Sequence, residues 1–220
     1  MALVFDFYFS FRSPYSYLAG PQIEALRAAY DVEPRMRIVL PIAIRIPGFF
    51  KQVNPLWPPY LLRDTMRIAQ MRDIPYRWPR PDPIVMDMAS KEVAAEQPYI
   101  YRVSRLGVAA ARLGDGFAFA RAASHAIWSG EADDWHQGDH LTRALRQAGI
   151  DPDKAERMLA EDVAGIDAEI AANEEGQKRA GHWGVPLFVF DEEPFFGQDR
   201  IEALLWRLKQ AGLAPRAQTD

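Results

Sequence analysis

The amino-acid sequence predicts an α/β fold in which small units of strand and helix, at the two ends of the chain, enclose a large block of helices. Runs of aromatic and β-branched residues, typical of strands, are concentrated near the start and the end of the 220-residue chain. Helix-start signals follow the first and the last of these runs. The middle of the chain shows helical patterns interrupted by proline and glycine turns.

The first predicted strand contains the aromatic-rich residues 5–9 and stops shortly before Ser13. Ser13 is a suitable N-cap, and Pro14 suits the first helical position because the N–H that proline lacks has no partner there. We therefore expect a helix over residues 14–30. A serine hydroxyl would then lie where the first strand ends and the first helix begins.

The second predicted strand covers residues 36–42, after a turn at residues 31–34. A strand, a helix and a strand in this order form a β-α-β unit, whose right-handed crossover makes the two strands parallel. The next segment, residues 47–59, is too rich in proline to be predicted as helical. Its three large rings either cover a core or line a pocket. These rings belong to Phe49, Phe50 and Trp57.

Helices are predicted for most of the middle of the chain, from the spacing of apolar residues and from the residues that interrupt them. The predicted ranges are 60–71, 94–113, 116–128, 139–148, 151–162 and 163–179. No repeat, low-complexity tract or linker separates these helices. We therefore expect them to pack on the sheet as an insertion.

Strand-like residues return near the end of the chain. Residues 185–190 form a predicted strand, residues 191–193 an acidic turn, and Pro194 begins the partner strand of a hairpin. A final helix is predicted over residues 201–210, with its apolar residues on one face. The order β-α-β, helices, β-β-α is that of a thioredoxin-like fold with a large all-helical insertion.

This order predicts a discontinuous thioredoxin-like domain of residues 1–46 and 180–220, with a helical insertion of residues 47–179. The start of the first helix and Val185 then meet at one edge of the sheet. A cis bond before Pro186 would turn the backbone groups of Val185 outward toward a ligand, whereas a trans bond would make Pro186 an ordinary edge-strand proline.

The amino-acid composition excludes several classes of function. A net charge of −4 gives no basic surface for nucleic acid. Because the chain has no cysteine, disulfides, thiolate zinc sites and a cysteine nucleophile are excluded, and any thiol must come from a ligand. Neither a signal peptide nor an apolar stretch of about 18 residues is visible, so we expect a cytoplasmic protein without a membrane partner.

No metal site is predicted. His136 and His140 are four residues apart, but Gly138 lies between them, which favours a surface loop over a pair of ligands. The backbone N–H groups and the dipole at a helix start instead favour a negative charge, such as a thiolate, beside Ser13. The alternative is that Ser13 only caps its helix.

Three sequence motifs together resemble those of a known family. They are residues 7–18 around Ser13-Pro14-Tyr15-Ser16, Gly184-Val185-Pro186 with Phe188-Val189, and Phe195-Phe196-Gly197-Gln198-Asp199-Arg200. The sequence resembles the 2-hydroxychromene-2-carboxylate isomerase family, which is grouped with kappa-class glutathione transferases and DsbA-like oxidoreductases. The insertion is similar only in its layout, at Asn54-Pro55 and in the predicted helix of residues 60–71.

The resemblance implies glutathione as cofactor. Ser13 would hydrogen-bond the glutathione sulfur and keep it as thiolate, and the backbone of Val185 would pair with the cysteinyl part. Asp199 would accept from the α-ammonium group, and Gln198 with the helix start would receive the carboxylate; the alternative is that these residues form a simple helix cap. The implied glutathione-binding residues are Ser13, Val185, Pro186, Gly197, Gln198, Asp199 and Asn54.

The family's reaction is an isomerisation. A thiolate adds to an unsaturated carbonyl substrate, the new single bond rotates, and elimination returns free glutathione. The implied substrate is an aromatic ring with a pyruvyl side chain, an intermediate of aromatic catabolism. The rings of residues 49–57 would wall its pocket, and its carboxylate would need a cation. The candidate substrate-binding residues are Phe49, Phe50, Trp57, Arg12, Arg45 and Lys51. Residues 82–88 replace the family's polar and basic stretch.

Two other functions stay open. A kappa-like glutathione transferase would form a stable adduct with an electrophile and consume glutathione, whereas a non-catalytic thioredoxin-fold protein would bind a partner without chemistry. Because Ser13 and Ser16 stand where DsbA-type enzymes carry two cysteines, dithiol exchange by the protein itself is excluded. The expected partner is a small aromatic molecule, and a homodimer is compatible with the sequence.

Overall fold

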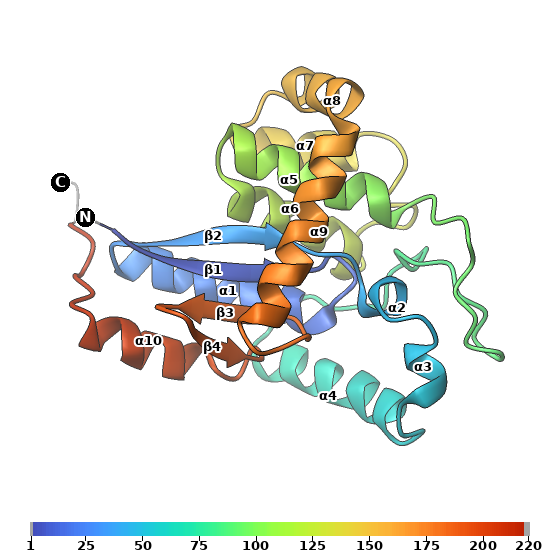
Figure 1. Ribbon diagram of the computed structural model, residues 1–220, viewed down its shortest axis with the longest axis horizontal. Helices are drawn as coiled ribbons and strands as arrows, with labels where there is room; N and C mark the ends of the chain where they lie inside the picture. The colour runs from blue at the N-terminus through green and yellow to red at the C-terminus, as the bar shows by residue number, and fades with distance from the viewer. Residues whose placement is uncertain (1, 218–220) are drawn as a thin grey trace.

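A computed structural model describes residues 2–217 (Figure 1). Within this range one sheet has the strand order β2-β1-β3-β4. The strands are β1 (Leu3–Phe9), β2 (Val32–Ile38), β3 (Leu187–Phe190) and β4 (Glu193–Phe196). The strands β1 and β2 are parallel, as predicted, and β3 is antiparallel to both β1 and β4. The predicted thioredoxin-like arrangement of the strands is thereby confirmed.

The helices follow the predicted order. The first, α1 (Pro14–Ala29), connects β1 to β2, and the last, α10 (Ile201–Gln210), follows β4. Between β2 and β3 lie α2 (Ile42–Arg45), α3 (Phe49–Gln52), α4 (Trp57–Met71), α5 (Ile100–Leu113), α6 (Gly116–Trp128), α7 (His140–Gln147), α8 (Pro152–Glu161) and α9 (Val163–Arg179). Figure 1 shows α9 crossing in front of the sheet, α1 behind it, and α5 to α8 gathered on the β2 side. The division into two domains stays a prediction.

Alternation along β1 explains how both faces of the sheet are covered. Phe5, Phe7 and Phe9 share one buried face, where the ring centroids of Phe7 and Phe188 are 4.7 Å apart. Tyr8 points to the other face and packs in a second apolar cluster with Leu187. Near its carboxyl end β1 is buried on both faces, so residues 7–9 form a continuous run of aromatic residues.

The predicted bounds of the second strand are wrong. The second strand covers Val32–Ile38 and includes Pro34, although residues 31–34 were predicted as a turn and 36–42 as the strand. The strand β2 lies at the edge of the sheet, where proline is tolerated because half of the N–H groups have no partner strand. The strand ends earlier than predicted because the chain turns into α2 after Pro41.

The segment 47–59 is also partly helical, contrary to the prediction. It contains α3 and the first turn of α4, which includes Pro58 and Pro59. Prolines are accepted in a first turn because the N–H groups there have no intrahelical partner. The helix predicted over 94–113 begins only at Ile100, since Pro98 disfavours a helical residue before it.

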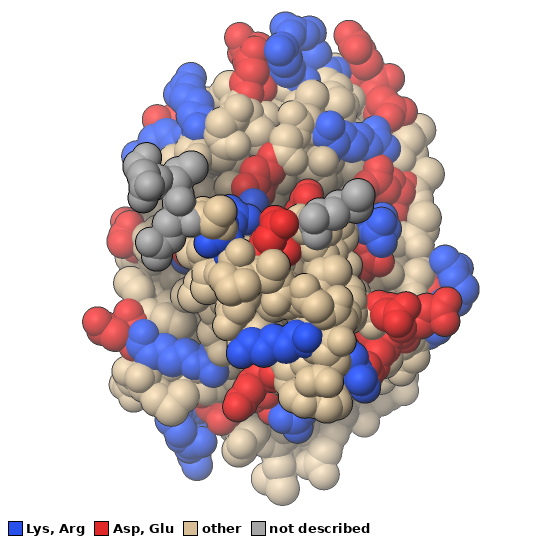
Figure 2. Space-filling view, turned by 90° about the vertical axis from the view of Figure 1, so that its left-hand side faces the viewer, with Lys and Arg blue, Asp and Glu red and all other residues tan. Residues whose placement is uncertain are grey.

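The surface agrees with a low net charge. In Figure 2, acidic and basic side chains are interspersed on the face that is shown, without a large area of one sign. No helix between residues 2 and 217 has the length and the apolar character needed to cross a membrane.

Candidate functional site

Ser13 lies at the junction that the sequence predicts. Its backbone is extended, and its Oγ accepts a hydrogen bond from the Ser16 N–H at 3.2 Å, so the predicted N-cap is confirmed. The same hydroxyl donates to the carbonyl oxygen of Val185 at 3.3 Å. Ser13 therefore caps α1 and also faces the segment before β3, 172 residues further along the chain.

Val185 and Gly197 extend this junction toward β4. The Val185–Pro186 bond is cis, the isomer that the sequence raised as one of two alternatives. The carbonyl oxygen of Pro186 accepts from the Gly197 N–H at 3.0 Å. Among the hydrogen bonds formed within residues 2–217, none uses the Val185 N–H. A donor next to Ser13 thus remains free for a ligand.

The turn between β4 and α10 carries the next polar groups. Gly197 has φ of +107°, and a Cβ there would lie 2.4 Å from Asp199 Oδ1, so only glycine suits this position. Gln198 is 7% exposed, and its backbone carbonyl accepts from Gln22 Nε2 at 3.1 Å. Asp199 is exposed and pairs with the adjacent Arg200 at 3.1 Å. The expected glutathione residues of this turn therefore lie beside Pro186.

Aromatic rings gather near Arg12, the residue before Ser13. Phe49 contacts the rings of Phe50, Trp57 and Trp183, with centroid distances of 5.3, 6.0 and 5.6 Å. Trp57 and Trp183 are partly exposed, so this cluster is not a closed core. Trp183 was not among the expected substrate-binding residues. Its position directly before the Gly184-Val185-Pro186 motif is the signal that points to it.

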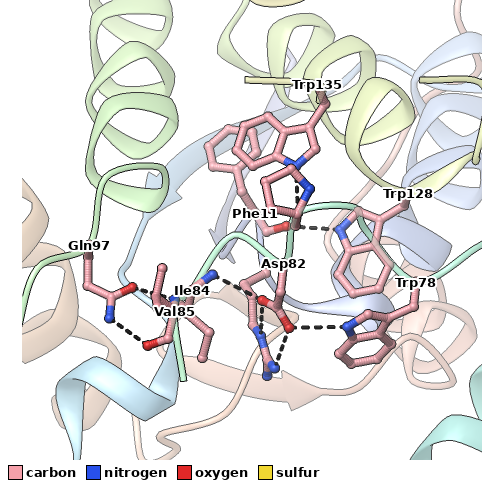
Figure 3. A network of polar contacts seen from close by, with 10 residues as sticks. Phe11, Trp78, Asp82, Ile84, Val85, Gln97, Trp128 and Trp135 are labelled. Atoms are coloured by element: carbon pink, nitrogen blue, oxygen red, sulfur yellow. Dashed lines mark hydrogen bonds and ion pairs between the residues drawn. The ribbon is translucent and has the colours of Figure 1, made fainter. Parts of the chain in front are cut away.

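Arg12 connects the rings to Ser13. Its guanidinium lies over the rings of Phe50 and Trp78, at 5.5 and 5.3 Å from their centroids. It also donates two hydrogen bonds to Asp82, at 3.0 and 2.9 Å (Figure 3). The residue directly before Ser13 is therefore held between the ring cluster and a carboxylate.

Asp82 is fully engaged in the same network. Besides Arg12, it accepts from Trp78 Nε1 at 3.1 Å and from the Ile84 N–H at 3.0 Å (Figure 3). The side chains of Arg12 and Asp82 are 12% and 24% exposed. From the sequence, residues 82–88 were predicted to differ from the family's polar and basic stretch, but the ion pair between Asp82 and Arg12 was not predicted. The pairing joins residues 70 positions apart, which no local pattern indicates.

The other two candidate cations are also engaged. Arg45 donates to the Leu40 carbonyl, to Gln177 and to the Trp183 carbonyl, at 2.7, 2.9 and 3.1 Å. Burial lowers the pKa of Arg45. Lys51 is exposed and pairs with Glu92 at 2.9 Å. Arg45 therefore anchors backbone segments, and Lys51 lies on the surface.

Asn54 has a local contact. It is exposed, and its side-chain oxygen accepts from the Leu56 N–H at 3.0 Å, just before α4 begins. Its expected role near the ligand stays a prediction. Within residues 2–217, no group of three or more His, Asp or Glu side chains is arranged to hold a metal ion.

Comparisons with known proteins show the family and the fold of this chain. The sequence model of the DSBA-like thioredoxin domain family matches residues 4–209. A search of curated protein sequences finds no significant match. Among solved structures, a 2-hydroxychromene-2-carboxylate isomerase is similar with a TM-score of 0.66 and 23% identity, covering 95% of this chain and 96% of its own.

Two further structures are similar in fold. A probable DsbA oxidoreductase from Streptomyces coelicolor has a TM-score of 0.65 and 19% identity, and the match covers 99% of this chain and 94% of that one. The cytosolic disulfide reductase DsbM from Pseudomonas aeruginosa, solved with GSH, has a TM-score of 0.58 and 16% identity, covering 94% and 100%. At these identities the likeness supports the fold alone.

Proposed function

The chain belongs to the DSBA-like thioredoxin domain family, and from this membership and the site at Ser13 we propose that it is a glutathione-dependent isomerase. The observation that carries the proposal is the contact of Ser13 Oγ with Val185 O, 3.3 Å apart, in a chain without cysteine. A thioredoxin-like site that lacks its own thiol is suited to a thiol supplied by a ligand.

The polar groups around Ser13 match a peptide thiol. The Val185 N–H is available to pair with a ligand backbone, as in the addition of a strand to a sheet edge. Gln198 and Asp199 offer an amide and a carboxylate beyond Pro186, where the γ-glutamyl end would lie. Asn54 belongs to the same proposal, although its side-chain oxygen already accepts from the Leu56 N–H.

Ser13 would act on the sulfur through a change of hydrogen-bond partner. Its hydroxyl would turn from Val185 O toward the ligand, and the N-terminus of α1 would add a favourable potential for negative charge. Both effects lower the pKa of a bound thiol. Bound glutathione supplies a thiolate that adds to an unsaturated carbonyl and leaves again after bond rotation.

The substrate in this proposal is an aromatic unsaturated keto acid, similar to 2-hydroxychromene-2-carboxylate. The rings of Phe49, Phe50 and Trp57 support it, because they provide a partly exposed aromatic wall next to Arg12. As part of the same proposal we assign the reaction to the cytoplasm and to aromatic catabolism.

One observation favours a kappa-like glutathione transferase as second candidate. Arg12 and Arg45 both have protein partners, so neither is a free cation for a substrate carboxylate. A neutral aromatic electrophile needs no such cation. It would form a stable adduct instead of an isomer.

Product analysis tests the proposal. The protein is incubated with glutathione and an aromatic unsaturated keto acid, while the substrate is followed by chromatography and the free thiol by titration. Isomerisation with a constant thiol concentration supports the isomerase, and loss of one thiol per substrate converted supports the transferase. S-methylglutathione is the control, because it lacks a thiol and should bind without supporting turnover. Absence of glutathione binding in calorimetry would favour the non-catalytic alternative.

A further inference from the structure

The backbone before Ser13 forms a tight turn between β1 and α1. The Ser13 N–H donates to the Ser10 carbonyl at 3.0 Å, so Phe11 and Arg12 are the two central residues of this turn. The position of the Ser13 hydroxyl therefore depends on how firmly the turn is held. Each central residue has a partner from the helices between β2 and β3 or from the loops that connect them.

The indole of Trp128 holds the first central residue. Its Nε1 donates to the backbone carbonyl of Phe11 at 2.9 Å, across 117 positions of the chain (Figure 3). Trp128 is the last residue of α6, and both Trp128 and Phe11 are fully buried. A buried carbonyl that loses its donor is left unsatisfied, which costs free energy. This bond therefore ties the turn to the end of α6.

Trp128 has supports of its own. Its ring stacks on the rings of Tyr17 and Tyr76, with centroid distances of 6.5 and 5.8 Å and interplanar angles of 17° and 8°. Its backbone carbonyl accepts from the Arg77 N–H at 2.7 Å. The indole N–H is thus presented to the turn from a fixed position.

The second central residue is held separately. The guanidinium of Arg12 donates to both carboxylate oxygens of Asp82, which lies in the loop between α4 and α5. A bidentate pair of this kind fixes the orientation of the guanidinium as well as its position. The turn is therefore held by one backbone contact, from Trp128, and one side-chain contact, from Asp82.

We propose that Trp128 is a positioning residue for Ser13: its indole N–H holds the Phe11 carbonyl and thereby keeps the Ser13 hydroxyl directed at a bound thiol. The inference rests on the proposed function, in which this hydroxyl bonds the glutathione sulfur. The Oγ of Ser13 is 3.2 Å from the Ser16 nitrogen and 3.3 Å from the Val185 oxygen. Both distances are long for hydrogen bonds, so a small shift of the turn is enough to break them.

Trp135 offers a matched control. It is also fully buried, and its Nε1 donates to the Pro81 carbonyl at 2.8 Å (Figure 3). The bonds of Trp128 and Trp135 are alike in donor, in kind of acceptor and in length, but only the first reaches the turn before Ser13. Pro81 precedes Asp82, and the bonds from Arg12 to Asp82 do not involve Trp135. If these indole bonds only stabilise the fold, the two tryptophans should respond alike to substitution.

The pKa of the thiol of bound glutathione, followed by its thiolate absorbance, tests the inference together with steady-state kinetics. Trp128→Phe keeps an aromatic ring and removes the N–H donor. It should raise this thiol pKa and lower kcat for the keto acid near neutral pH about tenfold, with an unchanged Kd for glutathione, because a small misplacement of a reacting group costs rate. Trp135→Phe should change none of the three. Both variants should lose similar stability in urea, so the difference between them reports the position of Ser13.

The outcomes separate the inference from the proposed function. An equal effect of the two variants on the thiol pKa, or no effect of either, would overturn the inference while the proposed function stands. A wild type that binds no glutathione, or binds it with an ordinary thiol pKa of about 8.5, would overturn the proposed function as well. If Trp128→Phe does not fold, NMR of the wild type decides: the indole N–H resonance of Trp128 should shift with pH at the pKa of the bound thiol, and that of Trp135 should not. A Trp128 resonance without this response would overturn the inference.

Discussion

The two sides of Ser13 differ in how their polar groups are used. On the side that we call the thiol side, formed by Val185, Gln198 and Asp199, the Val185 N–H and the Oε1 of Gln198 have no hydrogen-bond partner in the described part of the chain. On the other side, which we call the ring side, lie Phe49, Phe50, Trp57 and Trp183. The charged groups beside them already have partners: Arg12 lies over the Phe50 ring and pairs with Asp82, and Arg45 donates to the Trp183 carbonyl. The bidentate pair of Arg12 with Asp82 is the main example.

This difference separates the two halves of the proposed reaction. Donors and acceptors without a protein partner are prepared for a polar ligand, because binding satisfies them without breaking a protein contact. Paired charges between aromatic rings instead offer an apolar surface, because the charges are neutralised by each other. In the proposed reaction, the thiol side would bind glutathione and the ring side would bind the aromatic electrophile.

The largest expected effect comes from removing the hydroxyl at the border of the two sides. We expect Ser13→Ala to keep glutathione binding, to raise the pKa of the bound thiol, and to lower turnover near neutral pH about 100-fold. The thiolate absorbance of bound glutathione, followed against pH, measures the shift. An unchanged thiol pKa would remove Ser13 from its proposed role.

A matched control separates this effect from helix capping. Asp151 caps α8 away from the site by accepting from the Asp153 N–H at 2.9 Å. Both Ser13→Ala and Asp151→Ala should lower the free energy of unfolding by about 1 kcal/mol. Only Ser13→Ala should change the pKa of the thiol of bound glutathione.

Breaking the main ion pair of the ring side should have the next largest effect. Asp82→Asn leaves Arg12 partly buried without its charged partner, so we expect the free energy of unfolding in urea to fall by about 2 kcal/mol. Asp167→Asn breaks the more exposed bidentate pair with Arg105 and should cost only about 0.5 kcal/mol. Asp82→Asn should also improve the KM for a carboxylate substrate, because it frees Arg12. An equal loss of stability in both variants would contradict this view of the ring side.

Removing one ring should have a smaller effect and act on one substrate only. We expect Phe49→Ala to raise the KM for the aromatic substrate about fivefold, because it removes the ring that contacts three others, and to leave the Kd for glutathione unchanged. Steady-state kinetics and calorimetry measure the two constants. Trp206→Ala removes a partly exposed ring on α10 and serves as control. A parallel loss of glutathione affinity would show that the two sides are not separate.

The smallest effect concerns pH. Burial lowers the pKa of His182 from its ordinary value of 6.5. In the unfolded chain His182 therefore takes up a proton more readily, and the stability that neutral His182 contributes is complete above about pH 6.5 and is lost as the pH falls through the lower folded pKa. Urea denaturation is measured at about pH 7.5 and at about pH 5.5. The free energy of unfolding should fall more between these two values for the wild type than for His182→Gln. Identical drops would contradict the direction of the shift.

Local sequence patterns predicted much of the fold. The N-cap at Ser13, the hairpin of β3 and β4, and the bounds of α9 and α10 follow from residues within a few positions of one another. The errors have a different origin. Pro34 is accepted because β2 is an edge strand, and Pro58 because it lies in a first turn, so each depends on a position that the local pattern does not reveal.

The sequence by itself determined that no thiol belongs to this chain and that a hydroxyl lies at the start of the first helix, because composition and capping are local properties. Only the tertiary structure decided that Ser13 faces Val185 and that Arg12 is paired with Asp82. These pairs are far apart in the chain, and the packing of helices against the sheet brings them together.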